Sequence, residues 1–122
     1  MANNYNYVSE GDTFTKSVAT GGTAIDNGEV TNDGDLFGVS SEKIPAGGKG
    51  TVHRRGRYRL KANTLAFTKG QRLHWDFDND ELINTAAQTG DIENFGIAAE
   101  AKAAATLECE VMLTPERGSV KV

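Results

Sequence analysis

The feature that most constrains the fold is an alternating run at residues 50–61, with the sequence GTVHRRGRYRLK. Side chains two apart in a β-strand share a face, and neighbouring side chains point to opposite faces. Tyr58 and Leu60 therefore fall on one face of such a strand. The other face carries the cationic side chains of His53, Arg55, Arg57, Arg59 and Lys61. The sequence predicts one central strand with a row of positive charge on one side.

This basic run lies between two acidic segments. Residues 49–75 contain eight Lys or Arg and no Asp or Glu, whereas residues 1–48 sum to about −5 and residues 76–122 to about −7. The whole chain carries only −4, and non-specific DNA binding needs a basic footprint over much of a domain. The basic face is better suited to an acidic protein surface or to an acidic segment of a second copy, where charge complementarity fixes register.

Composition favours short strands. At 122 residues the chain is long enough for one domain, but hydrophobic residues make up only 38% and there are 14 glycines. Few large apolar side chains and many turn residues are typical of short strands rather than of a thick helical core. The predicted fold class is mainly β, a compact barrel or sandwich of short antiparallel strands with at most one or two short helical turns.

Sequence features also bear on where the protein is made. Cys109 is the single cysteine, so the chain forms no internal disulfide, which fits a reducing compartment. The first residues lack the basic and apolar regions of a signal peptide. No apolar run reaches the length that spans a membrane. These features predict synthesis in a cytoplasm and no membrane partner.

Period-two alternation and turn residues divide the rest of the chain into strands. Trp75, the single tryptophan, is the expected centre of the core, and Cys109 is an expected small core residue. The segment at residues 62–68 is a connector with one helical turn, and the Ala-rich run at residues 98–105 is compatible with a short helix or with a strand that ends in a loop. The expected strands are residues 13–20, 36–40, 71–78, 82–85 and 106–113.

Two motif-like segments do not meet their patterns. A phosphate-binding loop needs Ser or Thr directly after its Lys, and Gly50 follows Lys49 here. The segment DFDNDE at residues 76–81 begins like a calcium loop but lacks the required Gly at the sixth position and Glu at the twelfth. It reads as an acidic hairpin turn. His74 points outward from its strand with no nucleophile partner, so neither a catalytic residue nor a metal ligand nor a cofactor site is predicted.

The N-terminal residues interleave Asn with Tyr. Tyrosine joins an apolar ring to a polar tip and is a suitable anchor for packing on another surface. The arm is expected to pack on its own domain or on a neighbouring chain. Its candidate contacts are Asn4, Tyr5 and Tyr7.

The order of these segments resembles the small capsid cement, or decoration, proteins of tailed bacteriophages, over roughly residues 7–114. Each motif consists of small residues at turns, so the specificity lies in their shared order. The matching residues are Gly34, Asp35, Leu36, Phe37, Gly38 and Val39, then Ile44, Gly47, Gly50 and Val52, then Gly70, Leu73, Trp75 and Asp76, then Gly96, Ala98, Glu100, Ala101 and residues 107–113.

The resemblance implies a mainly β structural protein without enzyme activity. It implies an arm at residues 1–12, a β capsid-cement domain at 13–114 and a tail at 115–122. The partners are then the major capsid protein on the outer surface of the expanded shell and further copies of the chain, with a trimer favoured over a dimer. Such a protein is made in the bacterial host cytoplasm, resides in the virion, bridges neighbouring capsomers and stabilises the shell against the pressure of packaged DNA. The family also favours a strand over a helix for residues 95–113.

Arginine is denser on the basic run than the resemblance leads one to expect. If this row contacts the capsid or a sister subunit, reversing the charge at Arg55, Arg57 and Arg59 together should weaken attachment or oligomerisation without unfolding the monomer. The alternative is that this row is a solvent-exposed face that contacts no partner.

The alternative function, from a different class, is the binding of single-stranded nucleic acid by a small β-barrel. Proteins of that class use grooves in which cations lie near aromatic rings. Tyr58 lies on the opposite face from Arg57 and Arg59, so stacking and phosphate contacts would not converge. No direct nucleic-acid partner is therefore expected. No Ser-His-Asp, Cys-His or metal-ligand spacing supports an enzyme.

Overall fold

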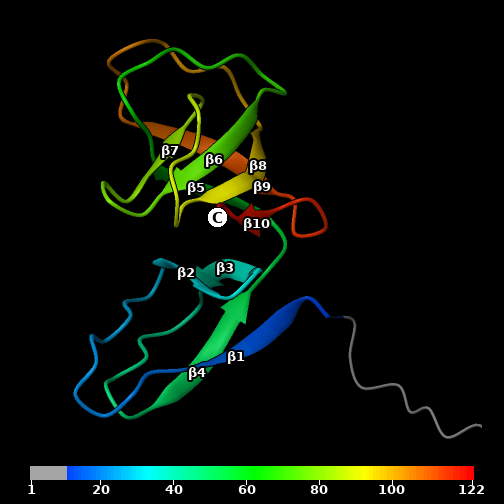
Figure 1. Ribbon diagram of the computed structural model, residues 1–122. Coiled ribbons are helices and arrows are strands. Elements are labelled where there is room, and N and C mark those ends of the chain that lie inside the picture. The colour runs from blue at the N-terminus through cyan, green and yellow to red at the C-terminus, as the bar shows by residue number, and fades with distance from the viewer. Residues whose placement is uncertain (1–10) are drawn as a thin grey trace, which may run out of the picture.

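The computed structural model describes residues 11–122, and every regular element in that part of the chain is a β-strand (Figure 1). The strands form two antiparallel sheets, which confirms the predicted mainly β fold. In chain order they are β1 (Thr13–Ser17), β2 (Val30–Asp33), β3 (Leu36–Ser40), β4 (Lys49–His53), β5 (Arg57–Lys61), β6 (Arg72–Asp76), β7 (Glu81–Ile83), β8 (Ile92–Ala98), β9 (Glu108–Leu113) and β10 (Ser119–Val120).

The first sheet has the strand order β1-β4-β3-β2. Strands β1 and β4 pair over five positions, from Thr13 opposite His53 to Ser17 opposite Lys49. Strands β3 and β4 pair at only two positions, with Val39 opposite His53. The ammonium of Lys16 on one edge strand bonds to the Asn32 carbonyl (2.8 Å) and to Asp33 (2.7 Å) on the other. The sheet is therefore bent enough for its two edges to be linked by one lysine.

Gly38 in β3 lies directly against the backbone of β4. A β-carbon at this position would stand 2.0 Å from the carbonyl oxygen of His53 and 2.7 Å from its carbonyl carbon. Backbone of β4 thus occupies the space that any other side chain needs, and only glycine permits this approach.

The second sheet has the order β5-β9-β8-β6-β7, with β10 paired to β8. It curls into a half-barrel, because Ala62 after β5 forms a bridge with Leu82 in β7 at the far edge. The Asn63 amide also donates to the Leu82 carbonyl at 3.0 Å. Ser119 and Val120, expected in a tail, belong to this sheet.

One core joins the two sheets. Phe37 from β3 contacts Phe95 from β8 with ring centroids 5.4 Å apart, and Trp75 from β6 lies 5.6 Å from the same ring. Trp75 is 4% exposed, which confirms its predicted core position. A smaller cluster of Ile25, Ile44 and Val52 packs under the loops of the first sheet.

The single strand predicted for residues 50–61 is wrong. The chain leaves the first sheet at His53 and enters the second at Arg57, so the run contributes β4 and β5 to different sheets. Gly56, with φ of 120°, turns the chain between them. Alternation alone cannot detect this break, because both strands keep the same period of two.

The other strand predictions are confirmed in position, with differences at their ends. Residues 62–68 form no helical turn. Leu107, expected on the buried face of the last long strand, precedes β9 and is 53% exposed. Strand β8 starts at Ile92, three residues before the segment 95–113 in which a strand was expected, and ends at Ala98. The Ala-rich segment after it is a loop that carries one isolated bridge at Lys102.

A bulge in β8 explains the early start of that strand. Leu73 lies opposite Gly96 and Trp75 opposite Ile92, so β8 advances four residues where β6 advances two. Asn94 within the bulge has φ of 55°, a region that Asn tolerates better than most residues. His74 was expected to point outward without a catalytic or ligand role, but it stabilises this bulge. Its Nδ1 accepts a hydrogen bond from the Asn94 amide at 2.9 Å, and the Thr114 hydroxyl donates to the Asn94 carbonyl at 2.8 Å.

Because His74 holds the bulge in its neutral form, the stability of the fold should depend on pH. Burial lowers the pKa of His74 below its ordinary 6.5, because it disfavours the charged imidazole. The unfolded chain then binds the proton more readily than the folded one, so stability is full above pH 6.5 and falls as the pH drops from there toward the folded pKa. Urea unfolding at several pH values measures this loss. His74→Asn keeps an acceptor near the Nδ1 position and should flatten the profile between neutral pH and the folded pKa; an unchanged slope contradicts the assignment.

Candidate functional site

The predicted row of cations is divided between three places in the structure. His53 lies at the end of β4, opposite Thr13 and Val39 in the first sheet. Arg55 lies in the linker between the sheets, whereas Arg57, Arg59 and Lys61 share the outer face of β5. Tyr58 and Leu60 on the other face of β5 pack against the core, as predicted for this strand. The candidates Asn4, Tyr5 and Tyr7 lie outside the described residues.

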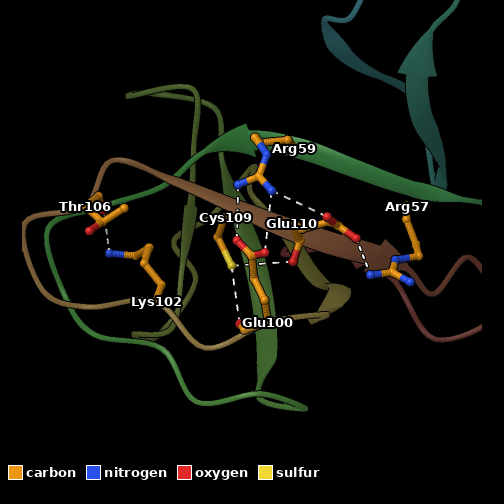
Figure 2. Close-up of polar contacts among 7 residues, drawn as sticks. All are labelled: Arg57, Arg59, Glu100, Lys102, Thr106, Cys109 and Glu110. Atoms are coloured by element: carbon orange, nitrogen blue, oxygen red, sulfur yellow. Dashed lines mark hydrogen bonds and ion pairs between the residues drawn. The ribbon is translucent and has the colours of Figure 1, made fainter.

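The cations of β5 face the acidic strand β9. Arg59 is directly opposite Glu110, and Lys61 is opposite Glu108. Arg59 forms ion pairs with Glu100 at 3.1 Å and with Glu110 at 3.5 Å, and Arg57 pairs with the other oxygen of Glu110 (Figure 2). The hydrogen bond that Arg59 donates to Glu100 raises the pKa of Arg59, and the charges of Glu100 and Glu110 add to this. We call this set the charge ladder: Arg57, Arg59, Lys61, Glu100, Glu108 and Glu110.

The charge ladder explains why the central run is so basic. Opposite charges on directly paired residues stabilise an antiparallel sheet modestly, whereas like charges there destabilise it. Glu108 and Glu110 stand at alternate positions in the sequence, so their common face was detectable; the pairing of β5 with β9 was not. Reversing Arg57 and Arg59 would put new carboxylates beside Glu100 and Glu110. The expectation that charge reversal leaves the monomer fold untouched is therefore revised.

Replacing one member of the charge ladder should have a small, salt-dependent effect. Arg59 is half exposed, and exposed ion pairs contribute little to stability. We expect Arg59→Gln to lower the urea midpoint of unfolding only slightly, and roughly 0.5 M NaCl to reduce the difference from wild type. Urea unfolding at low and high salt measures it. Lys43→Gln, which removes an exposed cation without an ion pair among residues 11–122, should show no such effect.

Two arginines of the linker hold the start of β1. The Arg54 amide donates to the Asp12 carbonyl at 2.7 Å, and its Nη1 donates to the Gly11 carbonyl at 2.6 Å. Arg55 forms ion pairs with Asp12 at 2.9 Å and with Glu116 after β9. The pKa of Glu116 is lowered, first by a hydrogen bond from its own backbone amide and then by Arg55. We call Arg54 and Arg55 with these partners the arginine clamp.

The remaining motif residues have structural roles. Cys109 is fully buried and lies near the carbonyl oxygens of Glu100 and Glu110, and burial raises the pKa of its thiol, which confirms a core residue. Asp76 accepts the amides of Asp78 and Asn79, so this segment is the predicted hairpin turn, between β6 and β7. Within residues 11–122, no group of three His, Cys, Asp or Glu is arranged to hold a metal ion.

The features that suggested nucleotide or nucleic-acid chemistry are separated by the fold. Lys49 begins β4 opposite Ser17, so the residues after it form a strand rather than a loop around a phosphate. The Tyr58 ring packs on the core, its hydroxyl donates to the Arg55 carbonyl at 3.1 Å, and burial raises its pKa. Tyr58 therefore offers no stacking platform beside the cations of β5. In the described part of the chain, no helix is long and apolar enough to cross a membrane.

Comparison with known proteins identifies the family. Residues 8–113 match the phage cement protein family, a span that covers both sheets from β1 to β9. The chain belongs to this family. No curated protein and no solved structure matches this phage cement protein. Family membership implies a structural, capsid-stabilising role in the virion and binding to capsid proteins, and the family is not known as enzymatic.

Proposed function

We propose that this cement protein binds the outer surface of the expanded phage capsid, bridges neighbouring major capsid proteins and stabilises the shell against the pressure of packaged DNA. The observation that carries the proposal is the family match over residues 8–113. The fold is suited to the task, because two sheets on one core form a compact domain, and ion pairs such as those of Arg55, Arg57 and Arg59 link its strands and loops.

Co-sedimentation with DNA-free shells tests this proposal. The purified protein is mixed with expanded and with unexpanded shells, and bound protein is measured across a concentration series. Saturable binding to expanded shells alone is the expected result, and DNA-filled heads with bound protein should resist heating better than bare heads. Equal binding to both shell forms would contradict recognition of the expanded lattice.

We also propose that the protein acts as a homo-oligomer, with a trimer favoured over a dimer, and that it is made in the host cytoplasm. In this proposal an arm at residues 1–12 precedes the cement domain at 13–114, and the C-terminal segment at 115–122 adds β10 to its second sheet. Asn4, Tyr5 and Tyr7 in the arm supply contacts. Stoichiometry on saturated shells distinguishes three-fold from two-fold sites. Deleting residues 2–10 should lower capsid occupancy while the unfolding midpoint stays unchanged.

A further inference from the structure

The outer face of the second sheet carries a row of four side chains that cross four strands. Arg57 on β5 is directly opposite Met112 on β9, which is opposite Ile97 on β8, which is opposite Arg72 on β6. Met112 is 46% exposed, and Ile97 is partly exposed. Two apolar side chains thus lie side by side on a solvent-facing sheet, with an arginine at each end.

A groove of about 290 Å³ is lined by three members of this row, Arg57, Met112 and Ile97, and Arg72 follows Ile97 in the same register just beyond it. Met112 and Ile97 form its apolar walls, Ala99 contributes a small side chain, and Arg57 and Lys69 stand at its rim. A volume of this size accommodates one large side chain rather than a whole ligand. Methionine adapts its shape to different partners, which suits a contact point in a protein interface.

Positive charge around the groove is only partly neutralised. Arg57 shares Glu110 with Arg59. Within residues 11–122, Lys69 and Arg72 form no ion pair; Lys69 is exposed, whereas Arg72 is partly buried and its Nη1 is a buried atom without a hydrogen-bond partner. In a protein with a net charge of −4, this is a local basic patch around an apolar centre. An apolar centre with a charged rim is the usual plan of a protein interface.

We propose that this groove docks an acidic segment of the major capsid protein, which inserts one apolar side chain between Met112 and Ile97 and places carboxylates against Lys69, Arg72 and Arg57. The assignment rests on the proposed function and adds the capsid-facing surface to it. The apolar side chain forms the centre of a larger interface, where most binding energy concentrates. The carboxylates supply register and association rate.

Two acidic segments of a second copy of this chain fit the groove less well. Its acidic hairpin at β6 and β7 carries Phe77, but this ring packs against its own core. The turn before Leu36 presents an exposed apolar side chain, but Asp33 there is paired with Lys16 and Asp35 accepts the Val120 amide. Neither segment offers a free apolar side chain beside free carboxylates.

Quantitative binding to expanded shells tests the groove with two matched pairs of variants. Lys69→Glu with Arg72→Glu should weaken binding more than tenfold and lessen its salt dependence. Lys43→Glu with Lys49→Glu makes the same charge change on the first sheet and should bind as wild type. Met112→Ala should weaken binding several-fold, whereas Leu107→Ala, which truncates a similarly exposed residue outside the groove, should not. Circular dichroism and the unfolding midpoint check that each variant folds.

Each outcome has a distinct meaning. If wild type binds and the groove variants bind as tightly as their controls, the groove assignment is wrong and the proposed function stands. If wild type binds neither shell form, the proposed function fails and the groove assignment fails with it. If the groove variants change the sedimentation of the free protein while shell affinity is unaltered, the occupant is a second copy and the capsid assignment is overturned.

Discussion

Gly38→Ala should be the most damaging single-methyl change in the first sheet, lowering the free energy of unfolding by about 3 kcal/mol or more. The added β-carbon would lie 2.0 Å from the His53 carbonyl oxygen. The atom in its path is backbone, so no rotamer change can relieve the clash. Strands β3 and β4 must instead separate at one of only two positions where they pair. For a domain of this size the midpoint should fall by roughly 10 °C.

Gly34→Ala is the matched control. Gly34 lies in the turn that precedes β3 and has φ of 58°, and a β-carbon added there would meet no heavy atom within 4 Å. Alanine at this position should cost only about 1 kcal/mol of backbone strain. Thermal and urea unfolding of both variants measures the difference. Equal losses would contradict the close approach of β4 as the reason that position 38 needs glycine, because Gly38 has no positive φ to account for it.

Lys102→Met should have the second large effect, a loss of about 2–4 kcal/mol. Lys102 is only 4% exposed. Its ammonium donates to the carbonyls of Thr106 (2.7 Å), Asn63 (2.8 Å) and Ala103 (3.3 Å) and stands 4.8 Å from the centre of the Phe67 ring. Methionine fills similar space but leaves these carbonyls without their donor. The loop after β8 should then open to water.

Hydrogen exchange and salt titration separate this effect from general loss of charge. Exchange should accelerate at the Ala105 amide, which donates to Thr64 across the same loop. Added salt should change the loss little, because the ammonium is buried and poorly screened. Lys43→Met, at an exposed position, should stay within about 0.5 kcal/mol of wild type. A similarly small effect for Lys102→Met would mean that the loop is held by its backbone bonds alone.

Strands were predictable from the sequence where alternation and turn residues agreed. Leu36–Ser40 is bounded by turns and is found as predicted. Trp75 alternates with polar neighbours and is buried. Failures occurred where a non-local pairing decided the outcome: the break at Gly56 depends on which sheet each half of the run joins, and the early start of β8 depends on the bulge at Asn94.

The candidate site was predictable only in part, for the same physical reason. The cations of β5 and their common face follow from period two. Their partners Glu100 and Glu110 are about 40 and 50 residues away in the sequence, and only the sheet order brings them together. Lys102 gave no signal, because a lysine in an Ala-rich run looks like a solvent-exposed residue until the carbonyls around it are known. The row across Met112 and Ile97 likewise exists only in the folded register.

The arginine clamp determines how the domain would respond to mechanical force. A pull applied ahead of residue 11 acts at the end of β1 where Thr13 meets His53, so it would peel an edge strand one residue pair at a time, the weakest way to load a sheet. Arg54 and Arg55 bind Gly11 and Asp12 before that first pair, and Arg55 also pairs with Glu116 in the turn that joins β9 and β10 of the second sheet. Tension applied at this end therefore loads the contacts of the arginine clamp first, and it is shared between both sheets before any β1–β4 residue pair is strained.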